Sequence, residues 1–187
     1  MKIHIKYMVS LRCRLVVKSA LEEAGIHYKS ISLGEVDLVS PASPEQLKQL
    51  RATLLRSGLI LIDDRQSIVV EKIKTLIIEM VHYTDDIPRI NLSDFVANKL
   101  HVEYTKASAL FSRVTGTTIE HFFILHRVER AKELLLYDEL NLSEIAYRLH
   151  FSSVAHLSNQ FKKITGLSPT LFKNLNSFKG RKNLEDI

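Results

Sequence analysis

A short alternating pattern and then a helical one open the chain. Ile3, Ile5 and Tyr7 alternate with polar residues over 2–8, and this period of two predicts a half-buried strand with those three side chains on one face. Residues 11–24 carry apolar side chains at helical spacing, which predicts an amphipathic helix. Its expected buried face consists of Leu15, Val16, Ala20, Leu21 and Ala24.

Three more strand patterns and one helical pattern follow within the first 62 residues. The strand patterns cover 27–33, 35–39 and 59–62, and the helical pattern begins after Ser43, which is its expected N-cap. The resulting order is β-α-β-β-α-β. This order predicts an α+β module of the ferredoxin-like class over 1–64.

From residue 66 onward helical patterns replace the strand patterns, and part of this region repeats itself. At an offset of 49 or 50 residues, Phe111 recurs as Phe161 and the turn residue His101 recurs as His150. The remaining paired landmarks are Asn91-Leu92-Ser93-Asp94 with Asn141-Leu142-Ser143-Glu144, and Thr115-Gly116 with Thr165-Gly166. Such a repeat indicates two copies of one supersecondary unit, and each copy has the pattern of a helix-turn-helix.

Helix ends in this region carry capping signals. Asn141 and Glu144 have the spacing at which an N-cap side chain and the third helical residue bind each other's backbone N–H groups. Thr117 and Glu120 have the same spacing. We expect them to start a long helix that runs to about Tyr137 and joins the two units.

Helical spacing also separates a buried from an outward face in the second helix of each unit. The side chains expected to be buried are Ala107, Leu110, Phe111 and Val114 in the first unit, and Leu157, Phe161 and Ile164 in the second. The outward faces carry Thr105, Lys106, Ser108, Ala109 and Ser112, and then Ala155, His156, Asn159, Lys162 and Lys163. By themselves, such small and polar residues are typical of a solvated surface.

Composition and charge narrow the class of protein. The 187 residues are 45% apolar and 25% charged, and no apolar run approaches the roughly 18 residues of a membrane helix. A single cysteine excludes an internal disulfide. Lys2, His4 and Lys6 interrupt the apolar residues at the N-terminus, so we expect a cytoplasmic protein without a secretory leader. The net charge is +5, and residues 141–187 have seven Lys or Arg against three Asp or Glu. This basic end is compatible with a nucleic-acid partner.

Two longer motifs of the helical region carry a family resemblance. They are Arg127-x-x-Arg130-Ala131-x-x-Leu134-Leu135, and Glu144-Ile145-Ala146 followed by Phe161-Lys162-Lys163-x-Thr165-Gly166-x-Ser168-Pro169. Together with the repeat, they resemble the AraC family of bacterial transcription regulators over 66–175. The resemblance implies an all-α DNA-binding domain with two helix-turn-helix units at 65–175. The basic C-terminal end is expected to be a mobile tail at 176–187.

The resemblance assigns DNA contacts to the second helix of each unit, which lies in the major groove in folds of this kind. The expected base contacts are Thr105, Ser108 and Ala109 in the first unit, and Val154, Ala155, His156 and Asn159 in the second. Lys106, Lys162 and Lys163 complete the DNA-binding set, the last two at phosphates. Neither outward face contains an arginine, so we expect modest binding by a single chain and discrimination through AT-rich sites, DNA shape or dimerisation. The first unit departs from the family pattern, because Phe111-Ser112-Arg113 replaces Phe-Lys-Lys.

The N-terminal module has Ser10-Leu11-Arg12-Cys13 directly after its first strand. Heavy-metal-associated domains, which the module resembles, carry Cys-x-x-Cys at this position. A single soft ligand is a poor site for Cu(I) or Zn, so no metal site is expected here. A redox-sensing thiol is an alternative, because a helix N-terminus and neighbouring arginines lower the pKa of a thiol.

These patterns favour a sequence-specific DNA-binding transcription regulator that has no cofactor and is not an enzyme. No Gly-rich phosphate loop and no Ser-His-Asp set in a supporting motif is present in the sequence. We expect double-stranded DNA as the partner, a homodimer formed through the N-terminal sensor or dimerisation module, RNA polymerase as a candidate partner, and no membrane. A small-molecule or metal ligand of that module stays open. The alternatives are a metal- or redox-responsive regulator that senses through Cys13, and an adaptor that binds no DNA.

Overall fold

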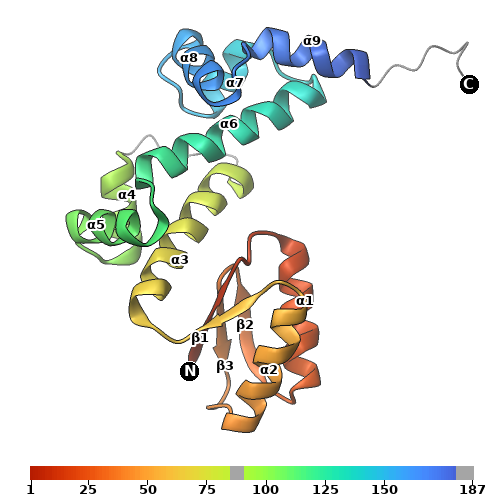
Figure 1. Ribbon diagram of the computed structural model, residues 1–187, viewed down its shortest axis with the longest axis vertical. Coiled ribbons are helices and arrows are strands. Elements are labelled where there is room, and N and C mark those ends of the chain that lie inside the picture. Colours follow the sequence, from red (N-terminus) through yellow and green to blue (C-terminus); the bar gives the residue numbers. More distant parts are fainter. Residues whose placement is uncertain (85–90, 180–187) are drawn as a thin grey trace, which may run out of the picture. The chain divides into compact units, whose positions relative to one another are not determined.

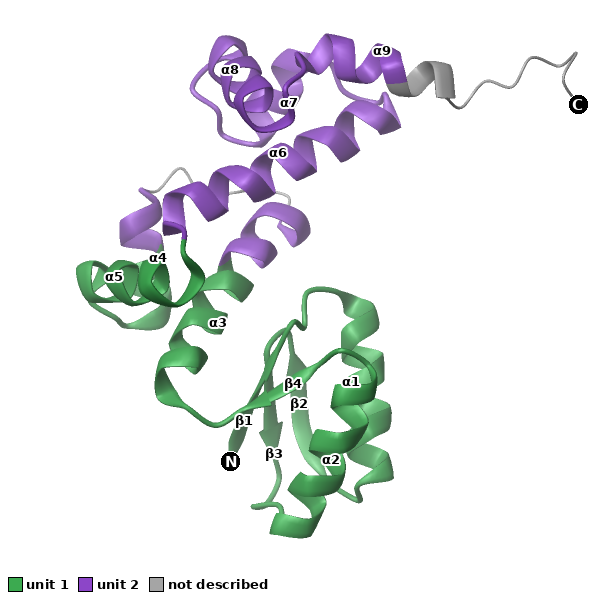
Figure 2. Ribbon diagram, viewed as in Figure 1, with its two compact units in different colours: residues 1–76, 96–116 green, residues 77–95, 117–187 purple. Residues whose placement is uncertain are grey.

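The computed structural model describes residues 1–84 and 91–179 (Figure 1). The chain divides into two compact units, which Figure 2 colours separately. The first consists of Met1–Leu76 and Val96–Gly116, and the second of Ile77–Phe95 and Thr117–Ile187. The two predicted recognition helices belong to different units, so each is described within its own unit.

A four-stranded antiparallel sheet forms the N-terminal module of the first unit. Its strands are β1 (Lys2–Lys6), β2 (Tyr28–Ser32), β3 (Glu35–Leu38) and β4 (Ile60–Ile62), in the spatial order β2-β3-β1-β4. Helices α1 (Leu11–Glu23) and α2 (Pro44–Arg56) lie on the same face of the sheet (Figure 1). The element order is the predicted one, and Ser43 caps α2 by accepting a hydrogen bond from the backbone N–H of Gln46.

The core of this module lies between the sheet and the two helices. Alternation along the strands directs Ile3 and Ile5 of β1 into it, and the register places Ile3 opposite Val36 and Ile5 opposite Leu61. The helices contribute Val17, Ala20, Leu21, Leu50 and Leu54 to the same cluster. Burial of this shared apolar face holds the module together.

Two predictions for this module are wrong. Tyr7 does not extend the buried side of β1, because it adopts a φ of 69° and is exposed, while Met8 is buried in its place. Leu15 and Val16 do not face the core, since they are 69% and 37% exposed. The helix packs through Val17, Ala20 and Leu21. The predicted burial of Ala20, Leu21 and Ala24 is confirmed, and Val17 is buried where Leu15 and Val16 were expected.

The rest of the described chain is helical. After α3 (Arg65–Ile78) comes a π-helical turn, η1 (Glu79–Tyr83). The later helices are α4 (Leu92–Leu100), α5 (Tyr104–Thr115), α6 (Ile119–Tyr137), α7 (Leu142–Arg148), α8 (Val154–Thr165) and α9 (Pro169–Lys179). This confirms the predicted repeat of two helix-turn-helix units, α4–α5 and α7–α8, and the long helix α6 between them.

Two boundaries of the helical region differ from the predicted ones. The N-cap of α6 is Thr118, whose side chain accepts from the backbone N–H of His121, and not Thr117. Ile119 is fully buried, so the start of α6 is set by that side chain as well as by the cap. α9 runs to Lys179, so the first four residues of the predicted tail at 176–187 are helical. Residues 180–187 lie outside the described residues.

Candidate nucleic-acid interface

The start of α7 is fixed by reciprocal side-chain caps. The Asn141 side-chain oxygen accepts hydrogen bonds from the backbone N–H groups of Ser143 and Glu144, at 2.9 and 3.0 Å. The Glu144 carboxylate in turn accepts from the backbone N–H of Asn141, at 2.7 Å. The predicted capping box is thereby confirmed. It satisfies backbone donors that have no partner within the helix.

The turn between α7 and α8 is built on two local features. His150 adopts a φ of 53°, in the left-handed region that non-glycine residues visit rarely. The Ser153 hydroxyl then accepts from the backbone N–H of His156 at 3.0 Å and starts α8. Gly166, with a φ of 78°, ends the helix. Both ends of α8 are therefore fixed by the sequence next to them.

One side of α8 is anchored in the core of the second unit. Leu157 and Phe161 are fully buried, and the Phe161 ring meets Phe172 of α9 edge to face, with 5.4 Å between centroids. Val128 and Ala131 of α6 belong to the same cluster. This packing determines which side chains of α8 remain outward.

A buried arginine connects α6 to the turn of the second helix-turn-helix. Arg127 is 6% exposed, and its Nε donates to the backbone carbonyl of Leu149 at 2.7 Å. Its guanidinium carbon lies 3.6 Å from the centroid of the Phe151 ring and 5.0 Å from that of Phe123. Burial lowers the pKa of Arg127 to about 10, so the side chain stays charged at neutral pH. The turn is thus held by a cation–π contact and a charged hydrogen bond.

The opposite side of α8 carries the predicted DNA-binding residues. Ala155, Asn159, Lys162 and Lys163 are exposed, and Val154 is half-buried. The lysines lie in the last turn of α8, where they also interact favourably with the helix dipole.

His156 is also half-buried, and its ring is held in place. Its Nδ1 and the Ser152 hydroxyl are 2.9 Å apart, and the ring packs edge to face on Phe151. The ring orientation is therefore set before any ligand binds.

The first helix-turn-helix repeats these local features. His101 also has a φ of 53°, and Gly116 ends α5 with a φ of 74°. The hydroxyl of Thr115 donates to the Phe111 carbonyl at 2.8 Å, and that of Thr165 does the same to Phe161. The internal repeat of the sequence is therefore a repeat of structure.

The outward face of α5 agrees with the prediction only in part. Thr105, Lys106 and Ala109 are exposed, and Ser108 is half-buried. Lys106 forms an ion pair with Glu103 at 2.6 Å, and the hydrogen bond and charge of Glu103 raise the pKa of Lys106.

Two residues of α5 change the predicted picture. Val114, predicted to be buried, is 48% exposed, because α5 packs through Ala107 and Phe111. Arg113 is exposed, and its guanidinium donates to the Gln66 side chain at 3.1 Å. The offset of 50 residues aligns Arg113 with Lys163. The predicted set of DNA-binding residues did not include Arg113. Arg113 therefore adds a positive charge to the exposed surface of α5.

Comparison with known proteins identifies this region. Residues 96–174 match the family model described as a helix-turn-helix domain. These residues therefore form a helix-turn-helix domain. The chain is also similar to the solved C-terminal domain of AraT, a response regulator from Geobacillus stearothermophilus. The identity is 29% and the TM-score 0.50, and the match covers 60% of this chain and 88% of that one.

The chain is also similar to bacterial regulators. The chain is 27% identical over 148 residues to an uncharacterized HTH-type transcriptional regulator of Staphylococcus aureus, and 24% identical over 97 residues to the uncharacterized HTH-type transcriptional regulator YdeC of Bacillus subtilis. These matches cover 79% and 52% of this chain, but only 18% and 32% of the relatives' own lengths. The chain therefore contains a DNA-binding domain of the kind found in transcription regulators.

Outside the helix-turn-helix domain, the thiol of Cys13 lies near the hydroxyl of Ser10, which stands at the first cysteine position of a Cys-x-x-Cys pattern. Its Sγ lies 3.3 Å from the Ser10 Oγ. Burial opposes ionisation of the thiol, but hydrogen bonds from Ser10 and from nearby backbone N–H groups lower the pKa of Cys13 overall. Among the described residues, no cluster of three or more His, Cys, Asp or Glu is arranged to hold a metal ion. Within the same residues, no helix has both the length and the apolar character needed to span a bilayer.

A pair of histidines connects η1 to α6 within the second unit, and the sequence did not predict it. His82 Nε2 and His126 Nδ1 are 3.2 Å apart. Burial lowers the pKa of His126 to about 4, and His82 lowers it further. Burial also lowers the pKa of His82, although Glu133, whose carboxylate is 4.0 Å from the His82 ring, opposes this shift. Both rings are neutral at pH 7.

We expect acid to weaken the second unit through this pair. The pKa of His126 in the folded chain, about 4, lies below its usual value of 6.5, so the unfolded chain binds more protons between these two pH values. Stability therefore falls as the pH drops from about 6.5 towards 4. The rings are partly exposed, so we expect an effect on the order of 1 kcal/mol. It can be measured as the loss of unfolding free energy between pH 7 and pH 5.

His126→Phe should reduce this loss, and His121→Phe is the matched control because His121 is an exposed histidine on the same helix. If wild type and His126→Phe lose the same stability between pH 7 and pH 5, the pair has no role in the acid response.

Proposed function

We propose that the chain is a sequence-specific transcription regulator whose helix-turn-helix domain reads the DNA major groove with α5 and α8. The proposal depends on the two faces of α8. Leu157 and Phe161 are buried on one face, and Asn159 and Lys162 are exposed on the other. Caps at both ends and the buried core fix this face in advance. A pre-oriented helix face loses little conformational entropy when it binds.

In this proposal the side chains of α8 divide into base-reading and phosphate-binding groups. Asn159 presents an amide, which pairs with adenine in the major groove. The Nδ1 of His156 is held by Ser152, so Nε2 is the ring atom that faces a base edge. Val154 and Ala155 suit the methyl group of thymine, and Lys162 and Lys163 suit phosphates.

The first helix-turn-helix contributes fewer direct contacts in this proposal. Thr105, Ser108 and Ala109 would contact bases, while Lys106 and Arg113 would contact phosphates. No arginine lies at a base-reading position, so guanine, its preferred partner, is not the main target. We infer that the chain favours AT-rich sites and that DNA shape contributes to its selectivity.

We further propose a division into a ferredoxin-like module at 1–64, the DNA-binding domain at 65–175 and a basic tail at 176–187. The order β2-β3-β1-β4, with β1 between β3 and β4, supports the ferredoxin-like class. The module would serve as a sensor or as the contact of a homodimer, which would match a repeated DNA site. RNA polymerase as a partner, and the resemblance of the module to heavy-metal-associated domains, stay predictions.

The experiment that tests this function measures binding to a set of duplexes over a series of salt concentrations. His156→Ala and Asn159→Ala should each remove about 1–3 kcal/mol of base discrimination. Lys162→Ala should weaken binding to all sequences alike and reduce the salt slope by about one.

The matched controls are Asn174→Ala on α9 and Lys48→Ala on α2, two exposed residues outside the proposed contacts. The assignment of the reading face is wrong if His156→Ala and Asn159→Ala leave both affinity and base preference unchanged.

A further inference from the structure

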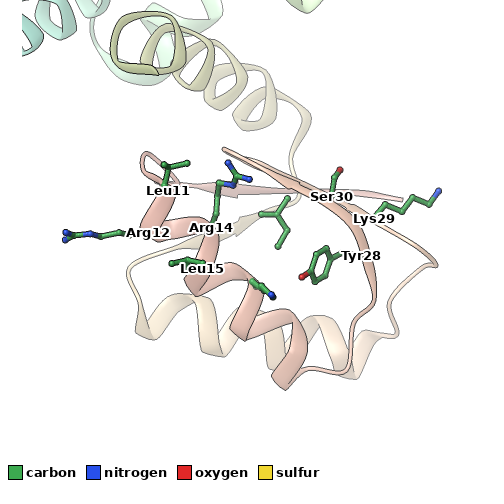
Figure 3. Close-up of a pocket in the computed structure, with 9 residues that line it drawn as sticks. Leu11, Arg12, Arg14, Leu15, Tyr28, Lys29 and Ser30 are labelled. Carbon is green, nitrogen blue, oxygen red and sulfur yellow. The ribbon is translucent and has the colours of Figure 1, made fainter. Parts of the chain in front are cut away.

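An open groove runs between α1 and β2 in the N-terminal module. Its volume is about 640 Å³, and Figure 3 shows its lining side chains. From α1 it is lined by Leu11, Arg12, Arg14, Leu15 and Lys18, and from β2 by Tyr28, Lys29, Ser30 and Ile31. Successive side chains of a strand point to opposite faces. Four consecutive lining residues therefore indicate that the groove follows the edge of β2 and not one face of the sheet.

The edge of β2 along this groove has no neighbouring strand. β2 is the last strand in the order β2-β3-β1-β4, and it pairs only with β3 among the described residues. A strand at a sheet edge presents backbone donors and acceptors that another strand can pair with. The register with β3 shifts between Tyr28 and Ser30. Lys29 lies at this shift on the edge strand, where a lysine typically prevents uncontrolled pairing.

The helix side of the groove is apolar and exposed. Leu11 is 57% and Leu15 69% exposed, although α1 has a well-packed buried face at Val17 and Leu21. Figure 3 shows Tyr28 extending from β2 toward α1, and Leu11 and Leu15 on α1. Exposed apolar side chains gathered in one place and surrounded by charged groups are typical of an interaction surface.

The charged groups around the groove all have the same sign. Arg12, Arg14, Lys18 and Lys29 line it, and no acidic residue does. Of these four cations, Lys18 has an ion pair within the described chain, with Glu22 at 3.9 Å. Such a surface attracts a negatively charged segment. It also repels a second copy of itself, because an edge-to-edge pair of β2 strands would bring two sets of these cations together.

We propose that this groove binds an extended, acidic segment of a partner protein, which adds a strand to the free edge of β2. The segment pairs its backbone with Tyr28–Ser32, so about five of its residues form the contact. Its apolar side chains pack on Leu11 and Leu15, and its acidic side chains face Arg14 and Lys29. None of the residues that line the groove belongs to the proposed DNA-binding set, so this proposal does not rest on the proposed function.

The test selects ligands for the immobilised full chain from a library of random peptides displayed on phage. The expected result is enrichment of peptides in which acidic and apolar residues alternate, because side chains of an added strand alternate between two sides. Enrichment of neutral or basic peptides, or no enrichment, would overturn the proposal.

The best enriched peptide is then titrated in solution by fluorescence anisotropy. Arg14→Glu and Lys29→Glu should each weaken binding at least tenfold, whereas Lys48→Glu, an exposed lysine of α2 outside the groove, should change it less than twofold. Methylation of alternate backbone nitrogens of the peptide should abolish binding if a strand is added. Equal binding of the methylated peptide contradicts strand addition.

A final measurement distinguishes a partner protein from a second copy of the chain. Sedimentation of wild type and Arg14→Glu should give the same oligomeric state. If the wild-type chain is a dimer and Arg14→Glu dissociates it, the occupant of the groove is a second copy and the proposal is overturned.

Discussion

Replacing Phe161 by alanine is expected to lower the free energy of unfolding by about 3–5 kcal/mol, and to abolish DNA binding with it. The ring is fully buried and packs on Phe172, so truncation removes its contacts and leaves a cavity in the core. The same ring sets the orientation of α8, because Phe161 and Leu157 are the buried residues of that helix. Thermal or chemical unfolding of the full chain measures the loss.

Leu136→Ala is the matched control for this variant, since Leu136 is a large apolar residue of α6 that is 54% exposed. It should change the unfolding free energy by about 0.5 kcal/mol or less. The role given to Phe161 is refuted if both variants unfold like wild type.

Replacing Arg127 by alanine is expected to cost about 2–4 kcal/mol of stability. The substitution removes the hydrogen bond to the Leu149 carbonyl and the cation–π contact with Phe151. Both contacts hold the turn between α7 and α8, so we also expect weaker DNA binding. Urea unfolding of the full chain, followed by titration with duplex DNA, measures both effects.

Arg130→Ala tests whether the loss of stability in Arg127→Ala comes from the buried position of Arg127 and not from the removal of a positive charge. Arg130 lies on the same helix and pairs with Glu133 three residues later, and such pairs contribute little to stability. Arg127→Met separates the two parts of the effect, because it keeps much of the apolar stem and removes the charge. Equal stability of wild type and Arg127→Ala would show that the buried cation does not hold the turn.

The sequence predicted the helix-turn-helix units well because their signals are local. A capping pair such as Asn141 and Glu144 needs only four residues of chain to form. The turns at His101 and His150 were located by the repeat, and the left-handed backbone at both positions agrees with that location. Because the pattern occurs twice, an element boundary that is ambiguous in one copy can be located from the other copy.

The errors arise where packing from elsewhere in the chain decides the outcome. The sequence of α1 offers Leu15 and Val16 as plausibly as Val17 for the buried face, and only the position of the sheet selects Val17. The predicted burial of Val114 fails for a similar reason, since α5 packs through Ala107 and Phe111.

In the candidate site, too, contacts between residues far apart in the sequence could not be predicted. The hydrogen bond between His82 and His126 joins residues 44 positions apart, and no periodic pattern reports it. Arg127 belongs to a motif that carried the family resemblance, but its burial against Phe151 depends on the fold of the second unit. Arg113 could have been found, because the repeat aligns it with Lys163.

The central claim is that this chain reads DNA sequence with its helix-turn-helix domain. Selection of binding sites from random duplex DNA by the purified full chain, at roughly physiological salt, tests it most directly, because specific and non-specific binding separate best under these conditions. The account predicts that wild type enriches an AT-rich motif, and that Asn159→Ala enriches a motif with at least one position relaxed. A folded chain that enriches no sequence would contradict the account.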